Sequence, residues 1–230
     1  MRQLLPFPCD PVDPVTLYGD LPPAGTRPTV RLNMIASIDG ATAVAGLSGG
    51  LGGPADQALF AVLRSQADIV LVAAGTVRAE HYGPAPVPVA VISRSCQLDW
   101  DSPFFTAAIA PPFVVTVAEA PALERKKAAD LAEVIIAGER DVDLAFALGA
   151  LAERGFARVL AEGGPSLNGQ LAAAGLVDEL CLTLSPLLAG GEAKRILAGP
   201  DLGLPGAGLG WRLRSLCEQD GFLFLRYRPE

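Results

Sequence analysis

The sequence predicts an α/β fold, a three-layer arrangement in which helices cover both faces of a mixed, mainly parallel central sheet. Apolar runs of strand length alternate with stretches whose apolar residues recur at helical spacing. Most of these runs are continuously apolar, as expected of strands covered on both faces. Residues 211–230 instead alternate around the turn dipeptide Asp220-Gly221, which predicts a C-terminal antiparallel hairpin.

The composition indicates a folded chain with a substantial core. Of its 230 residues, 50% are hydrophobic and 19% charged, which excludes a disordered chain. No apolar run reaches the about 18 residues of a membrane span, and the proline-broken start lacks the apolar segment of a signal peptide. The net charge of −7 argues against a nucleic-acid-binding face. We therefore expect a cytoplasmic protein that binds neither nucleic acid nor membrane.

Cysteine and histidine usage argues against a metal site. The four cysteines are scattered without a C-x-x-C pair, and His81 is the single histidine of the chain. The usual zinc ligand sets need more of these residues. We expect free, buried thiols and no metal.

Helix and strand signals follow one another along the chain. Residues 1–28 are rich in proline and lack periodicity, so we expect an arm that wraps a single domain formed by residues 29–230. Pro54, Asp143 and Pro165 are typical helix-start residues, and Gly155 is a typical helix stop. Strands are expected at 29–37, 68–74, 87–93, 112–118, 131–138, 157–161 and 177–186. Helices are expected from 54, at 76–82, at 143–155 and from 165 to near 175. Residues 41–53 form a glycine-rich loop.

Two glycine turns follow predicted strands. In "LAEGGPSLNGQL", a strand leads into Gly163-Gly164, and Pro165 then begins a helix. Unpaired N–H groups at a helix start attract anions, and glycine lets the backbone approach a phosphate closely. The alternative is an ordinary tight turn. Because "VLVAAGTV" repeats the design with Gly75 and Thr76, the two turns together could hold the two ends of a dinucleotide.

Two other glycine motifs are weaker indications of function. "GLSGG" at 46–50 matches a nucleophile elbow formally, but it lacks a preceding strand and a late histidine, so we do not expect a hydrolase. "GLPGAGLG" at 203–210 lacks dinucleotide-binding spacing and predicts a plain loop.

Three charged residues stand out. Glu162 lies at a strand's carboxyl end, where ligands bind in such sheets, although it could also be a solvated loop acid. Asp39 could be only a turn residue. Arg64 could simply extend to solvent from the end of its helix.

Three blocks of the chain together resemble a known family. These are "MIASIDGATAVAGLSGG", "LRSQADIVLVAAGTVRAE" and "LAEGGPSLNGQLAAAGLVDELCLTLSPLLAGG". They resemble the reductase domain of the riboflavin-pathway deaminase–reductases, in its stand-alone pyrimidine reductase branch, from about Arg31 to the final hairpin. The resemblance implies a dihydrofolate-reductase-like fold and a homodimer. It also implies NADPH-dependent reduction of 5-amino-6-(5-phosphoribosylamino)uracil to the ribitylamino product, with hydride moving from the nicotinamide C4 to the ribose C1′.

The resemblance also implies site residues. Glu162 would be the catalytic residue. Substrate contacts would come from Ser48, Arg64, Glu162 and Asp39. Cofactor contacts would come from Gly50, Gly75, Thr76, Glu80, Ser93, Arg94, Gly163, Gly164, Pro165, Ser166 and Leu167, with Arg94 placed to pair with the 2′-phosphate of NADPH.

The sequence departs from the family at two points. The zinc motif of the deaminase is absent, so we expect no deamination. After Glu80, the family often has an aspartate, a proline and then an arginine that contacts the substrate, whereas residues 81–90 contain no arginine. Two alternatives therefore stay open, namely a reductase of dihydrofolate or another pteridine and a nucleotide-binding protein without catalysis.

Overall fold

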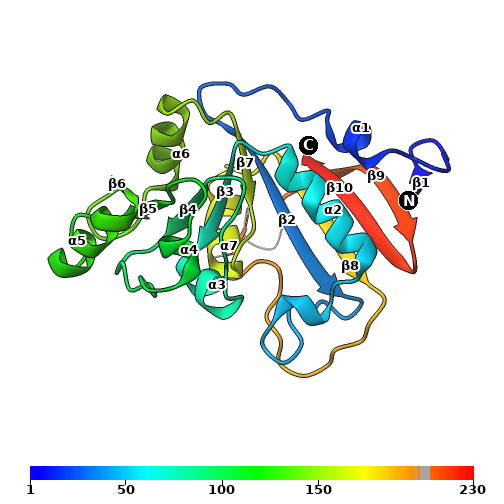
Figure 1. Ribbon diagram of the computed structural model, residues 1–230. Coiled ribbons are helices and arrows are strands. Elements are labelled where there is room, and N and C mark those ends of the chain that lie inside the picture. The colour runs from blue at the N-terminus through cyan, green and yellow to red at the C-terminus, as the bar shows by residue number, and fades with distance from the viewer. Residues whose placement is uncertain (200, 203–207) are drawn as a thin grey trace.

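A single mixed sheet organises the molecule (Figure 1). The computed structural model describes residues 1–199, 201–202 and 208–230. The strand order is β1-β9-β10-β8-β2-β7-β3-β4-β5-β6. The strands are β1 (Arg2–Leu5), β2 (Thr29–Ser37), β3 (Ile69–Ala73), β4 (Val89–Ile92), β5 (Phe113–Thr116), β6 (Glu133–Ile136), β7 (Arg158–Ala161), β8 (Glu179–Ser185), β9 (Trp211–Gln219) and β10 (Phe222–Pro229).

Strand directions confirm the predicted mixed, mainly parallel sheet. Strands β8, β2, β7, β3, β4, β5 and β6 run parallel to their neighbours in this block. Strand β10 pairs antiparallel with both β8 and β9, which confirms the terminal hairpin. Because seven strands run the same way, their carboxyl ends meet at one edge of the sheet.

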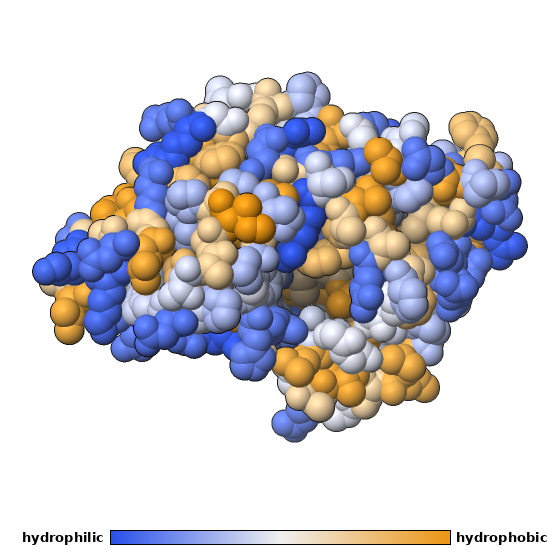
Figure 2. Space-filling model, in the orientation of Figure 1, coloured by the Kyte–Doolittle hydropathy of each residue, from blue (hydrophilic) through white to orange (hydrophobic). Residues whose placement is uncertain are grey.

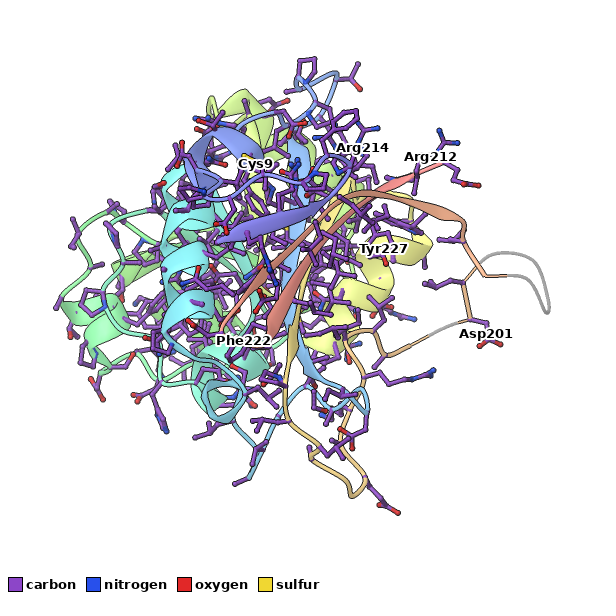
Figure 3. All side chains as sticks on the ribbon, turned by 90° about the vertical axis from the view of Figure 1, so that its right-hand side faces the viewer. Cys9, Asp201, Arg212, Arg214, Phe222 and Tyr227 are labelled. Carbon is purple, nitrogen blue, oxygen red and sulfur yellow. The ribbon has the colours of Figure 1, made fainter. Side chains whose placement is uncertain are left out.

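Helices cover both faces of the sheet. They are α1 (Pro14–Tyr18), the 3₁₀ turn η1 (Ser48–Gly50), α2 (Pro54–Ser65), α3 (Ala74–Ala79), α4 (Pro103–Thr106), α5 (Ala122–Leu131), α6 (Leu144–Glu153) and α7 (Pro165–Ala173). Leu59 and Leu63 of α2 belong to one buried cluster, and Leu148 of α6 and Leu171 of α7 to the other. Figures 1 and 3 show α2 and α7 on opposite sides of the sheet.

The predicted helix boundaries are confirmed where a capping residue marks them. Helix α2 begins at Pro54 and α7 at Pro165. The Asp143 carboxylate accepts the Phe146 N–H at 2.9 Å and so caps α6, and Gly155 follows that helix with a φ of 88°.

The N-terminal arm carries more regular structure than its sequence indicates. Arg2–Leu5 pairs antiparallel with β9, and α1 begins after Asp13, which caps it. Backbone pairing alone gives β1 its conformation, since four residues are too few to show an alternating pattern. Helix α5 is also absent from our expectations, because Ala128 is its one buried side chain.

A buried charge cluster ties this arm to the sheet. The Glu179 carboxylate accepts from Arg31 Nε at 2.7 Å and from Arg226 Nη2 at 2.8 Å, and all three side chains are at most 2% exposed. Arg31 Nη2 also donates to the backbone carbonyl of Tyr18 at 2.6 Å, at the end of α1. Burial works to raise the Glu179 pKa, but the charges of Arg31 and Arg226, together with the hydrogen bonds from Arg226 and Arg228, outweigh it and lower that pKa.

The cysteines are free, and all but one are buried. Cys96, Cys181 and Cys217 lie in the interior as predicted, whereas Cys9 is exposed. Among the described residues, no helix has the length and apolarity that crossing a bilayer requires, and no group of three or more His, Cys, Asp or Glu side chains could hold a metal ion. Of the loop predicted at 203–210, residues 203–207 lie outside the described residues, and 208–210 have no regular structure.

Candidate active site

The two glycine turns touch each other at the carboxyl edge of the sheet. Their strands, β3 and β7, are parallel neighbours. The Ala73 N–H donates to the Gly163 carbonyl at 2.6 Å, and a Cβ added at Gly164 would lie 2.8 Å from Thr76 Oγ1. Gly163 has a φ of 90°, and its peptide bond to Gly164 is cis. The neighbouring turn therefore leaves no room for a side chain at Gly164, whether or not a ligand also needs the bare backbone there.

The start of α7 fits an anion. Gly164 is its N-cap and Pro165 its first residue, so no side chain caps the helix. The N–H groups of Ser166 and Leu167 lie in the first turn, where a helix offers them no carbonyl partner. Ser166 is exposed and Leu167 is buried. These residues could hold a phosphate group by backbone donors and helix dipole.

Glu162, Arg64 and Tyr82 form one hydrogen-bonded group beside these turns. Arg64 Nε donates to Glu162 Oε1 and Arg64 Nη2 donates to Glu162 Oε2, both at 2.7 Å. The Tyr82 hydroxyl donates to Glu162 Oε2 at 2.5 Å. The family resemblance assigns Glu162 and Arg64 to the substrate separately, and the structure joins them in a bidentate ion pair.

Burial and charge set the protonation of this group. Burial raises the pKa of the Tyr82 hydroxyl well above its usual value, and the charge of Glu162 raises it further. Burial opposes the charge of Arg64, but its hydrogen bonds to Glu162 and the attraction of that carboxylate outweigh this and raise the Arg64 pKa. Tyr82 therefore stays a neutral donor and Arg64 stays a cation.

The 3₁₀ turn η1 is held by another predicted residue. The Ser48 N–H donates to Glu80 Oε1 at 2.9 Å, which joins a predicted substrate contact to a predicted cofactor contact. Gly50 lies in the same turn, where a Cβ would meet the Val44 side chain at 3.1 Å. This glycine therefore has a packing reason of its own.

Asp39 holds the loop that follows β8. Its carboxylate accepts from Ser37 Oγ at 2.5 Å, from the Ala189 N–H at 3.0 Å and from the Gly190 N–H at 2.7 Å. These hydrogen bonds, that from Ser37 first, lower the Asp39 pKa to about 2. The contacts favour a structural role, in which Asp39 fastens the loop after β8 to the end of β2.

The loop after β2, which carries Asp39, and the loop after β8, which carries Ala189 and Gly190, form a lobe at the carboxyl edge. Exposed apolar side chains lie on both of them, including Val44, Leu47, Leu187 and Leu188. Figure 2 shows the lobe below the main body, with apolar side chains on its surface and a hollow between the two. The hollow is the place on this face where a flat ligand could enter.

Ser93 and Arg94 follow β4 at the same edge. Ser93 is buried, and its N–H donates to the Val115 carbonyl at 2.9 Å. Arg94 donates to Asp141 at 2.9 Å in an ion pair whose side chains are 70% and 81% exposed. So exposed a pair contributes little to stability and leaves Arg94 open to a ligand phosphate.

Tyr82 is the member of the site that sequence reasoning missed. It lies beyond the end of α3, because that helix stops at Ala79 and does not extend through the predicted 76–82, and no motif marks the segment. The available signal was indirect: this is the segment in which the family's usual arginine is absent.

Known proteins are similar to this chain over most of its length. The RibD C-terminal domain family model matches residues 28–220. The 2,5-diamino-6-ribosylamino-4(3H)-pyrimidinone 5′-phosphate reductase of Methanothermobacter thermautotrophicus is 34% identical over 184 residues, which cover 74% of this chain and 83% of that protein. The RibD protein of Bacillus amyloliquefaciens is 31% identical over 75% of this chain and 49% of its own length.

Solved structures share the fold. A pyrimidine reductase-like protein from Corynebacterium diphtheriae superposes with a TM-score of 0.81 at 27% identity, covering 95% of this chain and 99% of that one. Dihydrofolate reductase from Enterococcus faecalis has a TM-score of 0.55 at 11% identity, over 88% of this chain and 96% of its own, which confirms the dihydrofolate-reductase-like fold. The chain belongs to the RibD C-terminal domain family.

Proposed function

We propose that this protein is an NADPH-dependent reductase of a ribosylaminopyrimidine phosphate of riboflavin biosynthesis. The observation that carries the proposal is the Arg64–Glu162–Tyr82 group, held beside two touching glycine turns at the carboxyl edge. Three curated relatives are named 2,5-diamino-6-ribosylamino-4(3H)-pyrimidinone 5′-phosphate reductase, which supports the reaction class.

The cofactor would lie across the two turns. The uncapped start of α7 would hold phosphate through the N–H groups of Ser166 and Leu167, and Thr76 Oγ1 lies next to that start. Arg94, open to solvent, would meet the 2′-phosphate. When bound, NADPH supplies the hydride. The remaining proposed cofactor contacts are Gly50, Gly75, Glu80, Ser93, Gly163, Gly164 and Pro165.

The substrate would meet the exposed side of the Arg64–Glu162 pair. The side chain of Arg64 is 25% exposed, whereas that of Glu162 is 4% exposed. Because Glu162 is paired with a cation, it would serve as an acceptor for a substrate N–H group and as an orienting partner for Arg64. Ser48, on the lobe, is a further proposed substrate contact. Asp39, which we expected to contact the substrate, would instead act indirectly by fastening the loop after β8 to the end of β2.

Two pyrimidines are candidate substrates. The three relatives' name specifies the 2,5-diaminopyrimidinone. The sequence resemblance implies the deaminated 5-amino-uracil form, which is also part of the name of a Thermotoga maritima deaminase and reductase, whose 21% identity supports the fold alone. We propose the diaminopyrimidinone as the preferred substrate, because the three relatives that carry its name include the one with 34% identity.

A pteridine such as dihydrofolate is a second candidate. It is favoured by one observation, the absence of arginine from residues 81–90, which removes a usual contact to a phosphorylated substrate. A dihydropteridine carries no ribose phosphate and would not need that contact.

The test is NADPH oxidation, followed by its absorbance, with each of these three substrates in turn. We expect turnover with a phosphoribosylaminopyrimidine and faster turnover with its 2,5-diamino form. No turnover with either pyrimidine would reject the proposed function, and turnover with dihydrofolate alone would establish the pteridine reading. NADH in place of NADPH tests the cofactor: we expect a higher KM, because Arg94 would lose its phosphate.

We also propose a homodimer, formed through the open face of the antiparallel strands. Along β8, Leu180, Leu182 and Leu184 alternate with buried residues and are half-buried, and Leu180 packs at one end against the cluster that contains Leu171. They align with Tyr227, Leu225 and Leu223 of β10 in that order. Figure 3 shows Tyr227 on the side of the hairpin away from α2. A continuous apolar stripe of this kind favours a second copy of the chain as its cover.

A further inference from the structure

The Glu162 carboxylate has little acceptor capacity left. Each carboxylate oxygen has two lone-pair sites. Oε2 accepts from both Arg64 Nη2 and the Tyr82 hydroxyl, and Oε1 accepts from Arg64 Nε. Oε2 is therefore saturated, and one site on Oε1 is available to a ligand.

Arg64 has donors to spare on its outer side. A guanidinium has five N–H donors. Glu162 takes one from Nε and one from Nη2, while Nη1 has no partner within residues 1–199, 201–202 and 208–230. The guanidinium carbon also lies 4.3 Å from the centre of the Phe60 ring and 5.6 Å from that of Tyr82. These rings and the carboxylate leave Arg64 little freedom to rotate.

Tyr82 is fixed independently of Glu162. Its ring meets that of Phe104 edge to face, with 6.5 Å between the ring centres, and packs against the buried cluster under α2. Its N–H donates to the Val77 carbonyl at 3.2 Å, at the end of α3. The hydroxyl therefore meets Glu162 from an anchored ring and can set where the carboxylate lies.

We propose that Tyr82 is a positioning residue of the substrate site, which holds Glu162 and, through it, directs Arg64 Nη1 and Glu162 Oε1 toward the pyrimidine. This inference rests on the proposed function and deepens it. Tyr82 lies in the segment where the family often has a substrate-contacting arginine, so the site is ordered here by a neutral donor. Substrate selection by this chain would then depend on the Tyr82 hydroxyl.

The test is the steady-state kinetics of Tyr82→Phe with NADPH and the pyrimidine that the wild type reduces. A hydrogen bond to a charged group is strong, so we expect its loss to raise the pyrimidine KM about tenfold. The KM for NADPH should stay within about twofold and kcat within about threefold, because the ring and the ion pair persist. Tyr18→Phe is the matched control: its hydroxyl is buried without a hydrogen-bond partner in the part of the chain that the structure describes, and we expect unchanged kinetics.

A double-variant cycle tests the route through Arg64. If Tyr82 acts through Glu162 on Arg64, the loss of kcat/KM in Tyr82→Phe/Arg64→Lys will be smaller than the product of the two single losses. A pyrimidine KM within twofold of wild type in Tyr82→Phe, or losses that multiply, would overturn the role of Tyr82 while leaving the proposed function intact. Absence of turnover in the wild type would reject the proposed function, and the Tyr82 inference with it.

Discussion

Single residues of the Arg64–Glu162 pair contribute unequally to stability. The side chain of Glu162 is 4% exposed and that of Arg64 25% exposed, so Glu162 alone would be a buried, unpaired charge. We expect Arg64→Met to lower the free energy of unfolding by about 3 kcal/mol, because removing one partner of a buried pair leaves the other as a buried charge without a partner. Glu162→Gln should cost about 1 kcal/mol, since the amide oxygen still accepts a hydrogen bond and Arg64, which loses its counter-charge, reaches solvent. Urea denaturation at pH 7 measures both.

The matched control for this comparison is Arg94→Met. Its ion pair with Asp141 is exposed on both sides, so the free energy of unfolding should change by less than about 0.5 kcal/mol. Equal costs for Arg64→Met and Glu162→Gln would contradict the asymmetry and would mean that water reaches Glu162.

The sequence singled out Glu162 and Arg64, but it could not predict which contacts they make. Glu162 was predictable because it ends an apolar strand, and Arg64 because it ends an amphipathic helix. Their pairing was not, since it depends on how α2 lies over β7. Tyr82 carries no motif, and its hydrogen bond to Glu162 depends on a ring position that packing against Phe104 helps to fix.

The two loops of the lobe are joined by a pH-sensitive contact. Besides the Asp39 contacts, the Ile38 N–H donates to the Leu187 carbonyl at 2.9 Å and the Thr42 N–H to the Lys194 carbonyl at 3.1 Å. Asp39 has a pKa of about 2 in the folded protein, below its value in an unfolded chain. Its contribution is therefore complete above about pH 4 and is lost as the pH falls through about 2.

The measurement is the amide proton shifts of Ala189 and Gly190 between pH 5 and pH 1.5. We expect both to follow one titration with a midpoint near the Asp39 pKa of about 2, because both N–H groups donate to that carboxylate. In Asp39→Asn this titration should vanish. A midpoint in the ordinary aspartate range, near 4, would show that the carboxylate does not hold the loop.

Individual elements were predictable where capping residues mark them. Pro54, Asp143 and Pro165 begin α2, α6 and α7 as expected, because their chemistry is local. Helix α5 was missed because a mostly exposed helix shows no apolar stripe. Strand β1 was missed because its conformation depends on β9, more than 200 residues later in the chain.

At the scale of the whole molecule, the strand order brings the site together. Strand β7 lies between β2 and β3, which places Glu162 against Arg64, 98 positions away in the sequence. Local patterns predicted the strands but not this insertion, because parallel strands without distinctive pairs can be ordered in several ways. The family resemblance carried that information, since related chains share the topology.

The dimer proposal makes the last prediction, at the same scale. Leu225 aligns with Leu182 of β8 on one side and Leu216 of β9 on the other, so it lies at the centre of the open sheet face. A glutamate there would bury a charge between two subunits, whereas in a monomer it would lie on a half-exposed strand. We expect the wild type to sediment as a dimer and Leu225→Glu as a folded monomer in analytical ultracentrifugation. Leu123→Glu, on a leucine of α5 that is 66% exposed, should stay a dimer. A wild-type monomer at micromolar concentration, or a dimeric Leu225→Glu, would place the subunit contact elsewhere or remove it.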